Sequence, residues 1–275
     1  MRFEIVTIFP GFFAGIFENG ILRRALAEGL VEVGVHDLRE FTHDRHRTVD
    51  DRPFGGGEGM VLKPEPLAEA LASLGIAPKA ERQSSDDAAA GTRVILLSAQ
   101  GRPFSQAMAR ELATLERVVL ICGRYEGVDE RVNQIYCDME LSIGDYVLSG
   151  GELAAAVVVD AATRLLPGAL GNEASSEFES FGVADAEIET DVEGVPRSQH
   201  GAGGLLDYPH FTRPAEFGGL RAPEVLMNGD HREIRRWRRE QQLRKTLTNR
   251  PDLLAGAALS KEDRKLLEAI QREAE

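Results

Sequence analysis

The chain contains the stretch Glu140-Leu-Ser-Ile-Gly-Asp-Tyr-Val-Leu-Ser-Gly-Gly-Glu152, and Cys122-Gly-Arg-Tyr-Glu-Gly-Val-Asp-Glu130 lies just upstream of it. A third segment, Leu97-Ser-Ala-Gln-Gly101, also combines glycine with polar side chains. The β-branched runs Val94–Leu97 and Val118–Ile121 predict strands that end where two of these segments begin. Parallel α/β sheets hold ligands at the carboxyl ends of their strands, so we expect the three segments to line one crevice.

The ligand of this crevice is predicted to be small, flat and mostly neutral. The chain has no G-x-G-x-x-G and no G-K-[ST] sequence, so it lacks the fingerprints of a dinucleotide or triphosphate cradle. Each segment taken alone is also compatible with an ordinary turn. Three such segments in succession, each with glycine and a polar side chain, favour a binding site.

Strands alternate with helices over the first part of the chain, which predicts an α/β fold with a mostly parallel sheet. Phe3–Phe9 predicts a buried strand, a helix through Ala27 is expected after it, and Val31–Val35 alternates like a second strand. Glu152–Leu166 predicts a strongly apolar helix. Lys79–Thr92 is polar and alanine-rich, which is typical of a loose surface connection.

Composition divides the chain into three predicted parts, 1–171, 172–206 and 207–275. Glu173–Pro196 contains eight carboxylates and no Lys or Arg, so residues 172–206 are expected to form a flexible acidic linker. Residues 207–275 are expected to form a small, basic, helical domain. Its clearest predicted helices are Arg232–Thr246 and Lys261–Glu273.

Overall composition is that of a globular protein, with 275 residues, 43% hydrophobic residues and a net charge of −13. This charge argues against indiscriminate nucleic-acid binding but allows a local basic patch. Cys122 and Cys137 give no disulfide framework, which favours a reducing, cytoplasmic location. A signal peptide at Ile5–Phe17 is disfavoured because Pro10-Gly11 interrupts it. No apolar run approaches the length of a membrane span.

The most highly charged stretch is Phe41–Gly59, which places two His, three Arg and three Asp between Thr42 and Pro53. A solvated charged loop explains this density as well as a binding role does. A metal site at His43 and His46 is disfavoured because no matching ligand set is present. The functional interpretation is a loop that meets a polyanion and a base edge. Its candidate contacts are Arg45, Arg47 and Arg52 for phosphates, Asp50 or Asp51 for guanine N–H groups, and Gly59 for close backbone approach, beside His43 and His46.

A second basic element is the predicted helix that contains Arg232-Glu-Ile-Arg-Arg-Trp-Arg-Arg239. Ile234, Trp237 and Leu243 are expected to form its buried stripe. The opposite face is expected to carry arginines at i, i+3, i+4 and i+7 and to contact a nucleic-acid backbone, although a solvated basic helix is the alternative. These arginines are Arg232, Arg235, Arg236 and Arg239.

Together these motifs resemble the bacterial tRNA guanine-N1 methyltransferase family (TrmD) over nearly the whole chain. The resemblance implies transfer of a methyl group from S-adenosylmethionine to N1 of the guanosine immediately 3′ of the tRNA anticodon, position 37. It implies a SPOUT-type sheet with a deep C-terminal trefoil knot, an exception to the usual rule against knots. It also implies a homodimer with active sites at the subunit interface. The matching stretches are Phe41–Gly59, Leu97–Gly101, Cys122–Val132, Ser142–Leu153, Leu205–Pro214 and Gly229–Trp237.

The resemblance assigns roles to residues by position. Residues 1–171 would bind the donor and carry catalysis, and 207–275 would bind tRNA. Arg164 ends the apolar helix, where capping the last carbonyls and supplying a positive charge to the crevice are both open roles. It matches the family's catalytic arginine. The positions that match the donor site are Leu97, Ser98, Gly123, Tyr125, Glu126, Ile143, Gly144, Asp145, Tyr146, Val147, Leu148, Gly150 and Gly151.

The sequence departs from the family pattern at the general base. The family has an aspartate before Ser-Phe in the linker, whereas this chain has Glu179 there, followed by an insertion-like stretch. Glu179 keeps the carboxylate and adds a methylene. Asp207 is the second candidate base, and Asp185 is a weaker one.

Two other functions remain open at this point. A catalytically silent relative would bind tRNA and the donor without turnover, and the change to Glu179 is the observation behind it. A nucleotide hydrolase using His43 and His46 is weakened by the missing phosphate-loop and metal motifs. The resemblance also suggests a Mg²⁺ requirement, although no protein metal site is visible in the sequence.

Overall fold

The computed structural model describes residues 1–83, 91–172, 176, 178–182 and 201–274. Within it the chain divides into two compact units, Met1–Gly171 and Asn172–Glu275, which we describe separately. Most of the predicted acidic linker, including Asp185, lies outside the described residues. The described residues contain no helix that is both long and apolar enough to cross a membrane.

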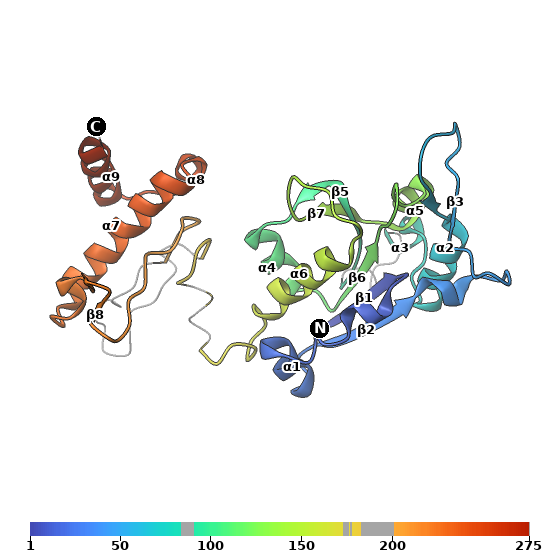
Figure 1. The fold of residues 1–275 in the computed structure, drawn as a ribbon, viewed down its shortest axis with the longest axis horizontal. Helices are drawn as coiled ribbons and strands as arrows, with labels where there is room; N and C mark the ends of the chain where they lie inside the picture. The colour runs from blue at the N-terminus through green and yellow to red at the C-terminus, as the bar shows by residue number, and fades with distance from the viewer. Residues whose placement is uncertain (84–90, 173–175, 177, 183–200, 275) are drawn as a thin grey trace. The chain divides into compact units, whose positions relative to one another are not determined.

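A five-stranded sheet with the order β2-β1-β6-β5-β7 forms the centre of the first unit (Figure 1). All four pairings of neighbouring strands are parallel. The prediction of an α/β fold with a parallel sheet is therefore confirmed. The strands are β1 (Arg2–Thr7), β2 (Glu32–Asp37), β5 (Thr92–Pro103), β6 (Arg117–Cys122) and β7 (Met139–Ser142).

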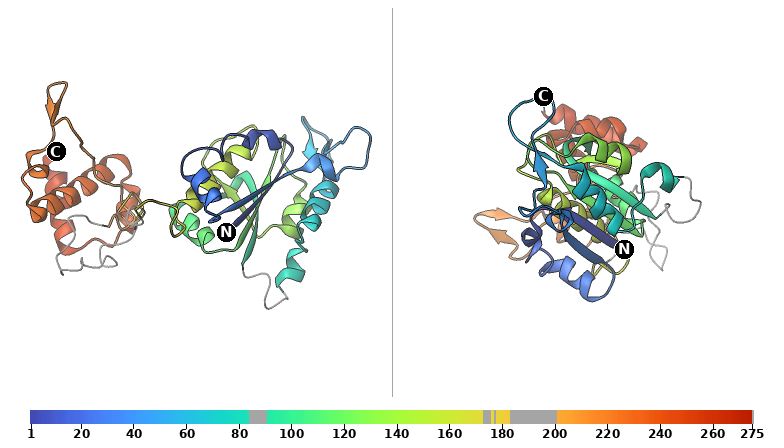
Figure 2. Two further views of the ribbon diagram at one scale, coloured as in Figure 1. Left: turned by 90° about the horizontal axis from the view of Figure 1, so that it is seen from below. Right: turned by 90° about the vertical axis from the view of Figure 1, so that its right-hand side faces the viewer.

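Helices cover both faces of this sheet, as Figure 2 shows. Alternate residues of a strand point to opposite faces, so Val118 and Leu120 of β6 join one apolar cluster while Val119 and Ile121 join the other. The first cluster receives side chains from α1 (Gly20–Ala27), α4 (Gln106–Ala113) and α6 (Glu152–Thr163). The second receives them from α2 (Pro64–Ser73) and α5 (Glu130–Tyr136).

Three sequence predictions for this unit are wrong in detail. Instead of one helix through Ala27, a 3-10 helix η1 (Pro10–Phe13) is followed by turns before α1 begins, and Gly15 has a φ of 90° that a helix cannot contain. The connection at Lys79–Thr92 contains a short helix, α3 (Lys79–Gln83). The apolar helix α6 ends at Thr163, before Leu166.

The segment Leu97–Gly101 also differs from the expected loop, because it lies inside strand β5. Leu97 and Arg102 both pair with Leu141 of β7, so the residues between them form an excursion in the strand register. A Cβ atom on Gly101 would lie 2.3 Å from the backbone nitrogen of Leu141, so only glycine fits this approach. The excursion is thereby held against the sheet edge.

The second unit is mainly helical in its described residues. Its helices are α7 (His231–Asn249), α8 (Asp252–Gly256) and α9 (Lys261–Ala274), and α7 and α9 correspond to the two predicted helices. Its core includes Leu205, Leu243 and Ile270. Smaller elements precede α7 in this unit. They are the hairpin of β8 (Glu216–Phe217) and β9 (Leu220–Arg221) and the 3-10 helix η5 (Glu224–Leu226).

Candidate functional site

Backbone contacts bring residues from all three glycine segments together at one edge of the sheet. The amide of Gly151 donates to the carbonyl of Gly123 over 2.9 Å, and Arg124 and Gly150 form an isolated bridge. A Cβ atom on Gly123 would lie 3.3 Å from the carbonyl oxygen of Leu97. Residues of the three glycine segments therefore lie together, as the sequence predicts.

Glycine suits this meeting point because backbone next to Gly151 and the Arg124 side chain next to Gly150 occupy the space that a larger residue would need. A Cβ atom on Gly151 would lie 2.7 Å from the Cα of Cys122. One on Gly150 would lie 2.1 Å from the side-chain nitrogen Nε of Arg124. Such short approaches let the two segments pack directly against each other.

The loop after β7 has a defined turn and an exposed rim. The Ser142 hydroxyl accepts from the Gly144 amide over 3.3 Å and donates to the Gly144 carbonyl over 3.0 Å. Gly144 has a φ of 154°, and the ring of Tyr146 lies where its Cβ would be. The Tyr146 ring and the Val147 side chain are both exposed. Ile143 to Leu148 thus offer a polar turn beside apolar surface.

The loop after β6 contacts the charged segment at Gly59. Tyr125 has a φ of 58°, a left-handed conformation unusual for a side chain of this size. The Glu126 amide donates to the carbonyl of Met60 over 3.0 Å, and its carboxylate lies 2.4 Å from where a Cβ of Gly59 would be. The structure therefore brings the predicted tRNA segment against the predicted donor segment.

The charged segment 42–59 is a mostly exposed stretch that enters a short hairpin at Asp50. Strand β3 (Asp50–Asp51) pairs antiparallel with β4 (Val61–Leu62). The Asp44 carboxylate accepts from the hydroxyl and amide of Thr48, which lowers its pKa. The side chains that this arrangement leaves exposed include His43, Arg45, His46, Arg47 and Arg52.

The histidines of this segment do not converge on a common point in the way metal ligands would. His43 contacts the Glu69 carboxylate over 2.8 Å, whereas His46 donates its backbone amide to the Asp44 carboxylate over 3.1 Å. Among the described residues there is no group of three His, Cys, Asp or Glu side chains that could hold a metal ion.

In the second unit, the segment with Glu179 lies beside the segment with Asp207. The Ser180 hydroxyl accepts from the Asp207 amide over 2.9 Å, and the Phe181 amide donates to the Leu205 carbonyl over 2.8 Å. The Asp207 carboxylate contacts His210 over 2.9 Å. The structure thus brings the two candidate bases into neighbouring segments, with Asp207 already engaged by a local partner.

Arg164 follows the last residue of α6 and lies after the buried Thr163. Its backbone amide donates to the Asp160 carbonyl over 3.2 Å, which continues the helical hydrogen bonding by one residue. The side chain is half-buried. The backbone of Arg164 is therefore held in place at the end of the apolar helix α6.

Helix α7 corrects one prediction for the basic face. Arg232 and Arg236 are exposed and Arg235 is half-buried, but Arg239 is only 7% exposed. Its guanidinium contacts the Asp263 carboxylate of α9 over 2.7 and 2.9 Å. The prediction that Arg239 lies on the outward face is wrong, because α9 packs over this part of α7.

The ion pair between Arg239 and Asp263 lowers the pKa of the Asp263 carboxyl. Burial raises the pKa of the Asp263 carboxyl, but the hydrogen bonds and charge of Arg239 outweigh burial and hold the pKa below its usual value. Gln242 accepts a further hydrogen bond from Arg239 over 3.0 Å. Arg239 thus joins α7 to α9.

Comparison with known proteins identifies the family. The family model described as tRNA (Guanine-1)-methyltransferase TrmD matches residues 1–256. This chain belongs to that family. A protein of Koribacter versatilis named tRNA (guanine-N(1)-)-methyltransferase is 58% identical over 271 residues, which is 98% of each chain. A protein of Geobacter sulfurreducens with the same name is 46% identical over 275 residues, which is 100% of each chain.

Two charged residues beside the close-packed glycines were not singled out by the sequence patterns. Arg124 and Glu152 lie within the two glycine segments, and their side chains contact each other over 2.9 Å. Glu152 also accepts from the Thr7 hydroxyl over 2.7 Å. Burial, followed by the nearby Glu152 carboxylate, raises the pKa of the Cys122 thiol, which is therefore protonated at neutral pH. The sequence did offer one signal for this contact, because Arg124 directly follows Gly123 and Glu152 directly follows Gly151.

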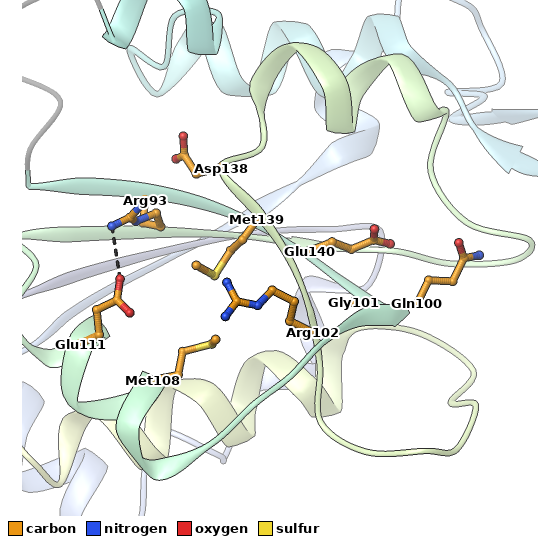
Figure 3. A pocket seen from close by; sticks show the side chains of 9 residues that line it. All are labelled: Arg93, Gln100, Gly101, Arg102, Met108, Glu111, Asp138, Met139 and Glu140. Atoms are coloured by element: carbon orange, nitrogen blue, oxygen red, sulfur yellow. Dashed lines mark hydrogen bonds and ion pairs between the residues drawn. The ribbon is translucent and has the colours of Figure 1, made fainter.

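A separate hollow of about 420 Å³ lies at the β7 edge of the sheet (Figure 3). It adjoins the register excursion of β5 but contains none of the predicted donor residues. Its charged side chains have both signs, and Arg93 contacts Glu111 across it over 3.4 Å. The remaining lining residues are Gln100, Gly101, Arg102, Met108, Asp138, Met139 and Glu140.

Proposed function

We propose that this protein transfers a methyl group from S-adenosylmethionine to N1 of the guanosine immediately 3′ of the anticodon in tRNA. The observation that carries the proposal is the family match over residues 1–256, to relatives named tRNA (guanine-N(1)-)-methyltransferase. The edge where Leu97, Gly123 and Gly151 meet supports a ligand site in the same part of the chain.

The residues at this edge fit the donor chemically. S-adenosylmethionine supplies a methyl group on a sulfonium, which makes the methyl carbon electrophilic. Its adenine is flat and neutral, and a crevice built from closely packed glycine loops suits such a ligand better than fixed charge does. Tyr146 and Val147 add exposed apolar surface at the rim. The proposed donor contacts are the thirteen positions given above from Leu97 to Gly151.

The chemistry assigns a separate task to each unit. Neutral guanine N1 is a proton donor and not a nucleophile, so a base must remove its proton, and Glu179 is the proposed base. As the proton leaves, negative charge grows on O6, which the guanidinium of Arg164 would stabilise. Asp207 is the second candidate base, because its segment adjoins that of Glu179.

We assign tRNA binding to two basic surfaces. One is the exposed charged segment with Arg45, Arg47 and Arg52, which contacts the loop after β6 at Gly59. The other is the start of α7, with Arg232 and Arg236 exposed. Exposed arginines fit a polyanion, because each phosphate contact releases condensed counterions. The resemblance suggests a Mg²⁺ requirement, and we propose that tRNA brings this ion to the site.

The donor edge adjoins an apolar surface that we propose as the contact of a homodimer. Phe9 is 45% exposed and Leu153 is 51% exposed, although both carry large apolar side chains. Phe12 and Val157 are also exposed, on η1 and α6, which contact each other. A surface of this kind marks a protein interface more often than free solvent. The trefoil knot and a cytoplasmic location complete the proposed assignment to this family.

Transfer of labelled methyl tests the function directly. The protein is incubated with methyl-labelled S-adenosylmethionine and an unmodified tRNA transcript with guanosine 3′ of the anticodon, beside a transcript with adenosine there. We expect label on the guanosine transcript alone. Equal label on both transcripts contradicts the target, and no label while both ligands bind would make the protein a silent relative.

A further inference from the structure

A buried ion pair connects the loops that follow β6 and β7. Arg124 lies in the first loop, and Glu152 is the first residue of α6, directly after the second. The Arg124 Nη2 atom lies 2.9 Å from Glu152 Oε2, and Nε lies 3.0 Å from the same oxygen. The side chain of Glu152 is 1% exposed and that of Arg124 is 18% exposed. Water therefore screens this attraction little.

Further contacts fix both partners in place. Arg124 Nη1 donates to the Ser149 carbonyl over 3.0 Å, so the guanidinium holds the end of the second loop through backbone as well as side chain. On the other side, the Phe9 ring centroid lies 4.5 Å from the guanidinium carbon. The Thr7 hydroxyl donates to Glu152 over 2.7 Å. The network therefore joins the end of β1 to both loops.

The ion pair sits where the loops are closest. Gly150 bridges Arg124 through the backbone, and a Cβ atom on Gly150 would collide with the Arg124 side chain. The Gly151 amide bonds to the Gly123 carbonyl directly below. The separation of the loops is thus determined by the length of one arginine side chain and by the absence of side chains on two glycines.

We propose that Arg124 and Glu152 are positioning residues of the methyl-donor site, which hold the loops after β6 and β7 at the separation that S-adenosylmethionine requires. The inference rests on the proposed function, because it assigns the donor to these loops. The Arg124 guanidinium is directed at Glu152 and Ser149, so its effect on the donor passes through loop geometry. Donor affinity is therefore the property that depends on the pair.

The test is a double-mutant cycle on donor binding with the full-length chain. Calorimetry measures the Kd for S-adenosylmethionine in the wild type, Arg124→Gln, Glu152→Gln and the double variant. We expect each single variant to weaken binding by about tenfold or more, and the double variant to lose less than the product of the two, because two amides can restore a hydrogen bond. The kcat at saturating donor and the KM for tRNA are expected to change little.

Two controls separate positioning from general stability. Arg131→Gln removes an ion pair with Asp129 near the same loop, but the Arg131 side chain is 61% exposed, so donor Kd is expected to stay unchanged. Thermal melts check that each variant is folded. If a glutamine variant does not fold, Arg124→Lys keeps the charge, loses the forked geometry, and is expected to weaken donor binding to an intermediate degree.

The outcomes separate this inference from the proposed function. Folded variants that bind the donor as the wild type does would overturn the positioning role, as would a loss confined to kcat. A wild type that binds the donor but never methylates tRNA contradicts the proposed function, while the Kd values of the variants still decide the role of the pair. A wild type that does not bind the donor contradicts both.

Discussion

The edge of the sheet where Leu97, Gly123 and Gly151 meet and helix α7 both contain arginines, but these arginines lie in different surroundings. At the sheet edge, where we propose that the methyl donor binds, Arg124 pairs with buried Glu152, and glycine lets the two loops pack closely. On α7, Arg232 and Arg236 are exposed to solvent, while Arg239 pairs with Asp263 inside the unit. A compact, nearly neutral ligand is held by backbone shape, whereas a polyanion needs exposed charge. Substitutions in the two regions should therefore differ in size and in salt dependence.

The largest effect is expected where a single group performs chemistry. Glu179→Gln keeps the size of the side chain and removes the base, so kcat should fall by about 10²- to 10⁴-fold with donor binding intact. Single-turnover methylation assays measure this loss, and Glu179→Asp, which restores the carboxylate, serves as the control. Normal turnover by the glutamine variant would transfer the role of base to Asp207.

Arg164→Ala should produce the next largest loss. Without a guanidinium near O6, the negative charge of the deprotonated guanine is less stabilised, and kcat should fall by about 10²- to 10³-fold. Comparing kcat with the Kd for S-adenosylmethionine separates this effect from donor binding. An unaltered kcat would remove Arg164 from the mechanism.

The buried ion pair between Arg239 and Asp263 in the second unit should affect the stability of the fold and not the methyl transfer step. Arg239→Met leaves the Asp263 carboxylate buried without its partner, which should lower the stability of the second unit by about 3 to 5 kcal/mol. Urea unfolding of the full chain measures this change. Asp252→Asn removes an exposed ion pair with Arg250 in the same unit and should have little effect. A stable Arg239→Met variant with weakened tRNA binding would restore the outward role first predicted for Arg239.

The same pair predicts a pH dependence with a definite sign. Because the folded pKa of Asp263 lies below its unfolded value near 3.9, the carboxylate contributes stability above that value and loses it as the pH falls through the folded pKa. The stability difference between the wild type and Arg239→Met should therefore shrink in strong acid. Unfolding measured at a series of acidic pH values checks this, and a difference that grows on acidification would contradict the assignment.

The smallest effect is expected from exposed charge on α7. Replacing Arg232 and Arg236 with Gln should weaken tRNA binding by about tenfold at low salt and reduce the slope of log K against log salt by about one to two. Binding titrations at several salt concentrations measure both quantities. Arg272→Gln, on the exposed face of α9, is the matched control. An unchanged slope would exclude the start of α7 from the tRNA contact.

Parts of the fold followed directly from local patterns. The strand runs ending at Leu97 and Ile121 correspond to β5 and β6, since continuous apolar runs suit strands buried on both faces. Strand β7 (Met139–Ser142) was missed because four residues of mixed character carry too weak a pattern. The segment 98–101 appeared to be a free loop because its pairing with Leu141 is a long-range contact that composition does not record.

Site residues show the same division between local and long-range information. Helical spacing groups Arg239 with Arg232, but it does not reveal that Asp263 of α9 lies over only one of them. Glycine at positions 150 and 151 signalled close approach, whereas the Arg124–Glu152 contact that accompanies it depends on how two distant loops fold together.

The most direct test of the central claim is the chemical identity of the methylated nucleoside. After reaction of the wild-type protein with S-adenosylmethionine and unmodified tRNA, the tRNA is digested to nucleosides and analysed by chromatography with mass spectrometry. We expect 1-methylguanosine as the product, and its loss in Glu179→Gln and Arg164→Ala. A methyl group on N2 or N7 of guanine, or on another base, would contradict the proposed deprotonation at N1 and the roles of both residues.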